Sequence, residues 1–145
     1  MRAIAVLIFA LMLAGCATTR PGASFVAPEV TAPDSAVLAA DTTDYLRTVY
    51  PAANTTLALE APAGKDANAL TPALNTALRE AGFAVIEVAG NAEEGQRIRY
   101  LVSPLDHGVA LRLQYQGVEA SRFYHRDTNG GLVAAAPFTV RETPR

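Results

Sequence analysis

The chain has 145 residues, half of them hydrophobic, and a formal net charge of −2 at pH 7. This length allows one domain with a core large enough to fold unaided. The slightly acidic balance excludes a general attraction for nucleic acid and a polybasic membrane patch. Cys16 is the only cysteine. A single cysteine excludes an internal disulfide and a CxxC metal site.

The first fifteen residues have the features of a secretory signal peptide. A positive start is followed by an apolar stretch over residues 3–13, and small residues then precede Cys16. These eleven apolar residues are fewer than the roughly 20 that a helix needs to span a bilayer. We therefore expect residues 1–15 to direct export and to be removed afterwards.

The order Leu13-Ala14-Gly15-Cys16 resembles the lipobox of bacterial lipoproteins. The resemblance implies that Leu13, Ala14 and Gly15 are recognised by signal peptidase II and that the Cys16 thiol carries the lipid. Removal of residues 1–15 would leave 130 residues, held on a membrane by acyl chains that each contribute ~0.8 kcal/mol per buried CH₂. Ala17 follows the cysteine, and no Asp stands there to retain the protein at the inner membrane, which implies the outer membrane. The alternative is an ordinary secreted protein with a small buried cysteine.

Residues 16–34 are rich in proline and show neither helical nor alternating periodicity. We expect a flexible lipidated tether, with a reach on the order of 60 Å when fully stretched, before a single domain over residues 35–145. Within the tether, Phe25-Val26 is either plain linker or a short segment able to pair with the sheet edge of a partner.

Two helices are predicted in the first half of the domain. The spacing of Leu38, Tyr45 and Val49 predicts a helix over residues 35–50, capped by Asp34 or Ser35. A strand over residues 55–60 follows. The second predicted helix is amphipathic, with an apolar face made of Leu70, Leu74, Ala77, Leu78 and Ala81. Its outer face carries Thr71, Asn75 and Arg79. Pro72 lies in its first turn, and Gly82 closes it. A strand over residues 83–88 comes next.

The second half of the domain is predicted to be a meander of strands. Alternation places Ile98, Tyr100 and Val102 on one face with Arg97 and Arg99 opposite. The next strand has Val109, Leu111, Leu113 and Tyr115 on one face, with Arg112 and Gln114 opposite, and turns lie at residues 106–108 and 116–117. A strand over 118–126, a turn over 127–131 and an edge strand over 132–141, weakened by Pro137, complete the chain. The predicted fold is α+β, with two layers: a mixed or antiparallel sheet of about five to six strands, and two helices on one of its faces.

No pattern of catalytic, cofactor-binding or metal-ligating residues is found. His107 and His125 lack a third ligand at suitable spacing, so we interpret them as surface residues. Ser103, Asp106 and His107 have the residue types of a hydrolytic triad but no GxSxG motif, and no phosphate-binding glycine loop is present. The arginines at 97, 99, 112 and 122 would form a basic stripe if they aligned. A solvated face with interleaved charge is the favoured interpretation, as it is for Asp41, Asp44 and the Glu93-Glu94 pair.

Several segments in order resemble the TrbH family of conjugal transfer lipoproteins over nearly the whole mature chain. They are the lipobox, Tyr50-Pro51-Ala52, LREAGFAVIE over residues 78–87, the IRYLV strand, Ser121-Arg122-Phe123-Tyr124 and the terminal Val140-Arg141-Glu142. Ala136-Pro137-Phe138 departs from the glycine and larger aromatics expected before the last segment, which leaves the pairing of the last strand open.

The resemblance implies a lipid-anchored outer-membrane component of a conjugative type IV secretion apparatus, with a structural role in mating-pair formation and no catalysis. Its partners would be the membrane and other transfer-apparatus proteins, bound through the sheet edge or the tether, with no direct nucleic acid and no small-molecule substrate or cofactor. A general cell-envelope lipoprotein that assists outer-membrane assembly or periplasmic binding is the alternative. An unrecognised periplasmic hydrolase is a further one, and it would need a polar pocket around a histidine.

Overall fold

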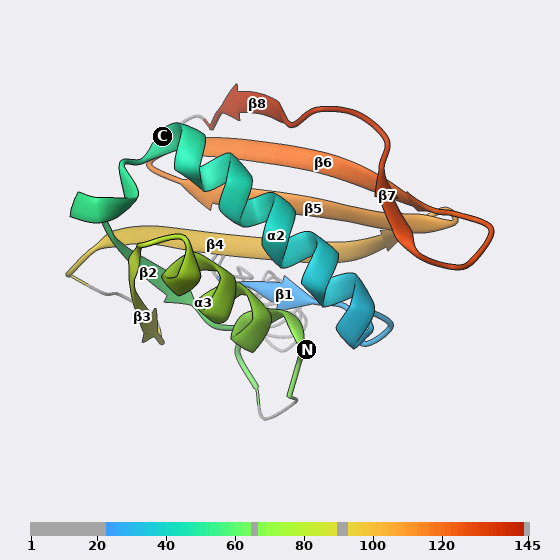
Figure 1. Ribbon diagram of the computed structural model, residues 1–145, viewed down its shortest axis with the longest axis horizontal. Helices are drawn as coiled ribbons and strands as arrows, with labels where there is room; N and C mark the ends of the chain where they lie inside the picture. The colour runs from blue at the N-terminus through green and yellow to red at the C-terminus, as the bar shows by residue number, and fades with distance from the viewer. Residues whose placement is uncertain (1–22, 65–66, 90–92, 144–145) are drawn as a thin grey trace, which may run out of the picture.

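The computed structural model describes residues 23–64, 67–89 and 93–143. Within them, two helices lie side by side over one face of a mixed sheet of eight strands (Figure 1). In chain order the elements are β1 (Phe25–Val26), α2 (Ala32–Val49), the 3₁₀ turn η1 (Ala52–Asn54), β2 (Thr56–Glu60), α3 (Leu70–Glu80), β3 (Ala84–Val88), β4 (Gln96–Leu105), β5 (Gly108–Tyr115), β6 (Val118–Arg126), β7 (Leu132–Ala134) and β8 (Thr139–Glu142). The predicted α+β class, with both helices on one face, is confirmed.

The sheet has a parallel part and an antiparallel part. Its order is β3-β2-β4-β5-β6-β7, with β2 parallel to both β3 and β4, and with β4 to β7 antiparallel. The long strand β4 pairs with β2 over its first half and with β1, in parallel, over its second half. Likewise β6 pairs with β8 near its start and with β7 near its end. The sheet therefore has more strands than the five to six predicted.

Helix α2 begins three residues before the predicted start, and its cap differs from the predicted one. Thr31 is the N-cap: its hydroxyl accepts from the Asp34 backbone N–H at 3.3 Å, and the Asp34 carboxylate accepts from the Thr31 N–H at 3.0 Å. This reciprocal pair satisfies two backbone donors at the helix start, which neither Asp34 nor Ser35 would do as the cap. The prediction of Asp34 or Ser35 as cap is therefore wrong.

Helix α3 follows the amphipathic prediction except at one residue. Leu70, Leu74 and Leu78 are buried, and Gly82 closes the helix with a φ of +95°. Thr71, predicted to face away, is buried instead. Its hydroxyl hydrogen-bonds the Tyr100 hydroxyl at 2.7 Å, because a short hydroxyl side chain at the helix edge can reach the strand beneath it.

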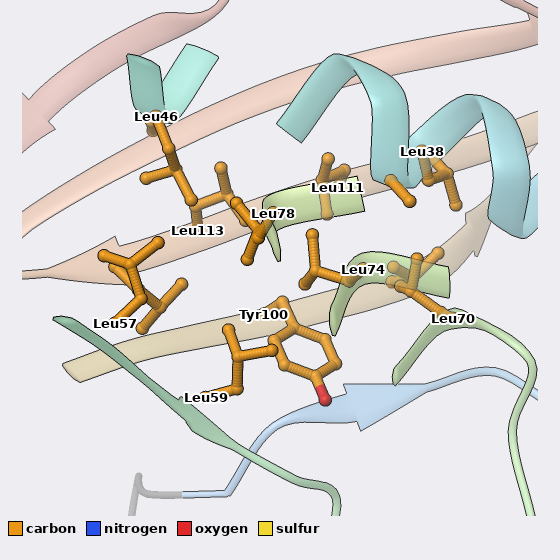
Figure 2. Close-up of a cluster of buried hydrophobic side chains, with 14 of the residues drawn as sticks. Leu38, Leu46, Leu57, Leu59, Leu70, Leu74, Leu78, Tyr100, Leu111 and Leu113 are labelled. Carbon is orange, nitrogen blue, oxygen red and sulfur yellow. The ribbon is translucent and has the colours of Figure 1, made fainter. Parts of the chain in front are cut away.

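The core lies between the helices and the sheet and consists mainly of leucines (Figure 2). Both strand predictions of alternation are confirmed: Ile98, Tyr100 and Val102 are completely buried, and so are Leu111 and Leu113 on the neighbouring strand. Each such side chain contributes roughly 1.5–3 kcal/mol when it leaves water. Neither of the two described helices covers the opposite face of the sheet, and we call it the open face.

Two predicted boundaries are corrected. The single edge strand expected over residues 132–141 is two strands, β7 and β8. The strand is interrupted around Pro137, because proline has no N–H to donate to a neighbouring strand. Residues 24–34, which we expected in the tether, belong to the folded domain: β1 joins the sheet, and α2 starts at residue 32. The part of the tether before residue 23 lies outside the described residues.

Candidate functional site

The chain enters the domain through a short segment that is fastened to β4. The Tyr100 N–H donates to the Ser24 Oγ at 3.0 Å, and the Ala27 N–H donates to the Val102 carbonyl at 3.0 Å. Ser24 and Ala27 are both buried. Phe25-Val26 thus pairs with the chain's own sheet, where we had expected a plain linker or a segment for a partner's sheet. The backbone of β4 beyond the end of β2 would otherwise be unpaired, and β1 satisfies it.

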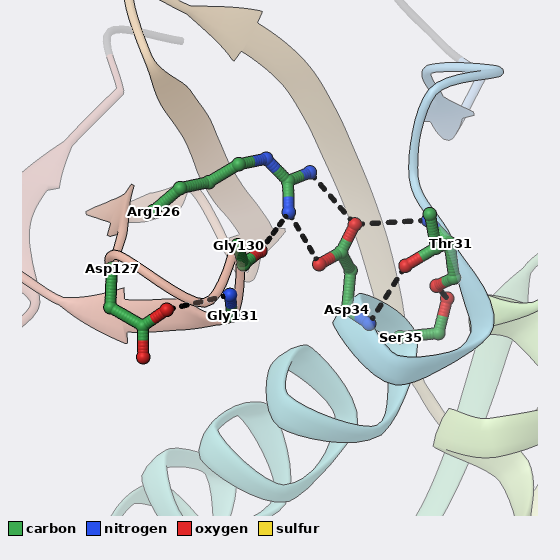
Figure 3. Close-up of polar contacts among 7 residues, drawn as sticks. All are labelled: Thr31, Asp34, Ser35, Arg126, Asp127, Gly130 and Gly131. Atoms are coloured by element: carbon green, nitrogen blue, oxygen red, sulfur yellow. Dashed lines mark hydrogen bonds and ion pairs between the residues drawn. The ribbon is translucent and has the colours of Figure 1, made fainter.

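A partly buried ion pair fixes the start of α2 to the end of β6 (Figure 3). The Arg126 guanidinium donates to both Asp34 carboxylate oxygens, at 2.9 and 2.8 Å, and also to the Gly130 carbonyl at 2.8 Å. The hydrogen bond from Arg126 lowers the pKa of Asp34 below its usual value and outweighs the opposing effect of burial. Since the Asp34 carboxylate also accepts from the backbone N–H of the N-cap residue Thr31, its oxygens are occupied, and its role is structural.

A second polar contact ties the middle of α2 to β6. Arg122 donates to the Asp41 carboxylate at 2.9 Å, and the Tyr124 hydroxyl donates to the same oxygen at 2.8 Å. Burial raises the pKa of Tyr124, and the hydrogen bond to Asp41 raises it further. Arg122 therefore lies on the helix side of the sheet, whereas the other three arginines of the stripe considered from the sequence lie on the open face. The four arginines do not form one stripe. Asp41, interpreted as a surface charge, is its partner.

The open face is charged at one end. Arg99 donates to Glu60 at 2.7 Å, with Arg97 4.0 Å from the same oxygen. Arg141 and Gln114 donate to Glu119 at 2.6 and 3.1 Å. Glu60 and Glu119 are both buried. We call the set Glu60, Arg97, Arg99, Arg112, Gln114, Glu119 and Arg141 the charged half.

The two carboxylates of the charged half are held by arginines. Burial alone would raise the pKa of Glu119, but the hydrogen bonds from Gln114 and Arg141 lower it below the usual value. An open hollow of about 490 Å³ lies beside this end, lined by Arg97, Arg99, Gln114 and the turn over residues 115–118. The buried carboxylates thus act as counter-ions of the neighbouring arginines. This pairing favours a structural role for the two carboxylates over a role in proton transfer.

The other end of the open face is mostly apolar. Strand register places Phe25 beside Leu101, Ala110 beside Phe123, and Val133 beside His125, all on this side of the sheet. Leu105 lies on the same face, four residues beyond Leu101 on β4. We call Phe25, Leu101, Leu105, Ala110, Phe123 and Val133 the apolar half.

The family is settled by sequence comparison. The profile described as Conjugal transfer protein TrbH matches residues 18–143. The chain belongs to the TrbH family. The matched region contains every helix and strand that the structure describes, and the match confirms the resemblance seen in the ordered segments. Membership in the TrbH family implies a role in conjugal transfer and association with the cell envelope. Comparisons with curated proteins and with solved structures find no match.

The residues predicted to carry the lipid and the peptidase recognition lie outside the described part of this TrbH-family chain. These are Cys16, Leu13, Ala14 and Gly15. Lipid attachment at Cys16 therefore stays a prediction from the sequence. Among the helices that the structure describes, none combines the length and the apolar character needed to cross a bilayer.

The two histidines are both exposed. The hairpin brings them to one end of the sheet, where the Arg126 N–H donates to the His107 carbonyl at 3.2 Å and His125 precedes Arg126 on β6. Ser103 and Asp106 lie at the same hairpin. Over residues 23–64, 67–89 and 93–143, no three His, Cys, Asp or Glu side chains form a group able to hold a metal ion.

Sequence reasoning missed three structural roles, and two of them had a signal. Thr31 and Asp34 have the spacing of a capping box. Arg122 was predictable as core-facing, because a two-residue turn that pairs Tyr115 with Val118 also pairs Leu111 with Arg122. The pairing of Asp34 with Arg126, far apart in the chain, had no local signal.

Proposed function

We propose that this TrbH-family chain is a lipid-anchored outer-membrane component of a conjugative type IV secretion apparatus. Its role is to hold or assemble the mating-pair apparatus rather than to catalyse a reaction. The single observation that carries the proposal is the family match over residues 18–143, which begins two residues after Cys16. The lipobox Leu13-Ala14-Gly15-Cys16 supports the anchor, and Ala17 supports the outer membrane.

The polar groups of the domain favour a structural role. Asp34, Asp41, Glu60 and Glu119 each accept hydrogen bonds or ion pairs from arginine side chains. In Asp34 and Glu119 the hydrogen bonds lower the pKa of the carboxyl group, which makes these two side chains poor general bases. A domain held at a membrane beside other transfer-apparatus proteins gains effective concentration for weak contacts with them. Its partners are the membrane and those proteins, with no direct contact to nucleic acid and no small-molecule substrate.

The proposal is tested by deletion of the gene and a plasmid-transfer assay. Deletion should abolish or strongly reduce transfer, and the full-length chain should restore it. Cys16→Ser should restore it poorly, because the domain then lacks the acyl chains. A chain carrying a cleavable, non-lipoprotein signal is the control, since it delivers the same domain to the periplasm without the anchor.

Two results would count against the proposal. Unchanged transfer after deletion contradicts a role in the conjugation apparatus. Full restoration by the unlipidated control contradicts the anchor while leaving the conjugation role in place. A defect in envelope integrity with normal transfer would instead support the alternative of a general cell-envelope lipoprotein.

A further inference from the structure

We propose that the apolar half of the open face rests on the lipid surface that holds Cys16, so that the domain lies against the membrane instead of standing off it. This inference rests on the lipid anchoring proposed above. It adds a second membrane contact, made by side chains of the folded domain.

Only a short length of chain separates the lipid-bearing Cys16 from the folded domain. Ser24, the first residue fastened to β4, follows Cys16 by only eight residues. Fully extended, this segment spans at most about 29 Å, and as a flexible coil it spans about 16 Å on average. From the sequence we expected a tether over residues 16–34, which can separate the domain from the lipid by on the order of 60 Å. The segment between Cys16 and Ser24 allows at most about half of that separation. The acyl chains hold β1 near the lipid surface.

Strand β1 is a fixed part of the sheet. Ser24 and Ala27 hydrogen-bond the backbone of β4 on either side of Phe25-Val26, and both are buried. A segment held at both ends transmits the position of the anchor to the domain. The end of the open face that contains β1 is therefore the end nearest the bilayer.

Apolar and charged side chains lie at different ends of the open face. The apolar half extends from β1 and Leu101 to the end of the sheet where β4 ends and β5 begins. The charged half occupies the opposite end of β4, β5 and β6, and Arg112, the partner of Leu101, marks the boundary between the halves. In the described residues, five large hydrophobic side chains are classed as exposed: Phe25, Val37, Leu105, Val133 and Val140. Three of the five lie in the apolar half, with Phe25 and Leu105 both 48% exposed. Singly scattered apolar side chains are ordinary on protein surfaces, whereas a cluster marks an interaction site.

Lipid is favoured over a protein partner as the occupant because the anchor already holds this end beside it. An apolar surface with an aromatic edge, held at the interface, buries its side chains at the boundary of headgroups and acyl chains. The polar side chains at this end are Ser103 on β4, Asp106 and His107 in the turn after Leu105, and His125 beside Val133. Arg112 lies beside Leu101, at the boundary with the charged half. The charged half remains in water and is free of the bilayer in this orientation.

Tryptophan scanning of the full-length protein, purified from membranes and reconstituted in phosphatidylethanolamine/phosphatidylglycerol vesicles, tests the inference. The chain contains no tryptophan, so each introduced one reports alone. Phe25→Trp and Leu105→Trp place the probe in the apolar half. Val140→Trp is the control, because Val140 is 54% exposed and pairs with the core residue Ala120, which places its side chain on the helix side of the sheet, away from the apolar half.

The emission of the Phe25→Trp and Leu105→Trp variants should shift to the blue and be quenched by vesicles that contain doxyl-labelled lipid. The emission of the Val140→Trp variant should remain unquenched. Circular dichroism of each variant confirms the fold, and intact mass of the same samples reports the acylation of Cys16.

The outcomes separate this inference from the anchoring proposal. Acylated protein whose emission is unquenched at 25 and 105, or equally quenched at all three positions, overturns the membrane contact and leaves the anchor standing. Protein without acyl chains at Cys16 overturns both. A photo-cross-linker at position 25 that captures a protein in cells, together with absent quenching in vesicles, would assign the apolar half to a protein partner instead.

Discussion

Removing the Asp34 carboxylate should destabilise the domain far more than removing another carboxylate of the same helix. The Asp34 side chain is only 3% exposed, accepts both hydrogen bonds of the Arg126 fork and completes the cap with Thr31. Because the Arg126 side chain is 33% exposed, we discount its two charge-assisted bonds to about 2 kcal/mol together. Loss of the hydrogen bond from the Thr31 N–H to the carboxylate, which is one of the two bonds of the capping box, adds about 1 kcal/mol. Asp34→Ala should therefore lower the free energy of unfolding by about 3 kcal/mol.

The assay is urea unfolding followed by circular dichroism, with thermal unfolding in parallel. For a domain of this size a loss of about 3 kcal/mol lowers the Tm by about 12 °C. Asp44→Ala is the matched control, since Asp44 lies on α2 but is 77% exposed and only 4.0 Å from Arg47. It should change stability by less than about 0.5 kcal/mol. Similar small losses for both variants would refute the reasoning.

The pH dependence of the Asp34→Ala effect has a fixed sign. The hydrogen bond from Arg126 lowers the pKa of Asp34 in the folded state below the usual value of 3.8. The ion pair thus stabilises the fold fully above that value, and its contribution is lost as the pH falls through the lower, folded-state pKa. The difference between wild type and variant should be full at pH 7 and shrink below about pH 4. A difference that grows on acidification would contradict the assignment.

Two core substitutions give further predictions. Thr71→Val removes the partner of the buried Tyr100 hydroxyl and should cost about 1–3 kcal/mol in urea unfolding; adding Tyr100→Phe should recover part of it, and an additive loss would argue against the pairing. Gly108→Ala would place a Cβ 1.9 Å from the Tyr124 carbonyl oxygen and should cost about 3 kcal/mol. Gly131→Ala, whose Cβ would meet its nearest neighbour at 3.5 Å, should be nearly neutral, and equal effects at the two glycines would refute the packing argument.

The elements that sequence reasoning predicted well are those whose signal is local. The apolar face of α3 repeats every three to four residues, and the apolar faces of β4 and β5 repeat every two, so periodicity alone located them. The two-residue turn after Tyr115 likewise has a local signal in Gln116-Gly117, both of which have positive φ in the structure.

The features that sequence reasoning missed depend on contacts between distant segments. A strand of two residues, such as β1, has too little alternation to be recognised, and only the free edge of β4 explains its position. Thr71 was assigned to the outer face by helical period, but the Tyr100 hydroxyl beneath it favours a polar partner. The candidate surface could be predicted only in part: strand alternation placed Arg97 and Arg99 opposite the core, whereas the apolar half becomes visible only once β1 and β7 take their places beside β4 and β6.

The covalent state of Cys16 is the most direct test of a membrane-anchored role. Intact-mass measurement of the native protein extracted from cell membranes should find residues 1–15 removed and the mass of acyl chains added to a 130-residue chain. A chain that begins at Met1, or one that lacks acyl mass and is recovered without detergent, would contradict the account.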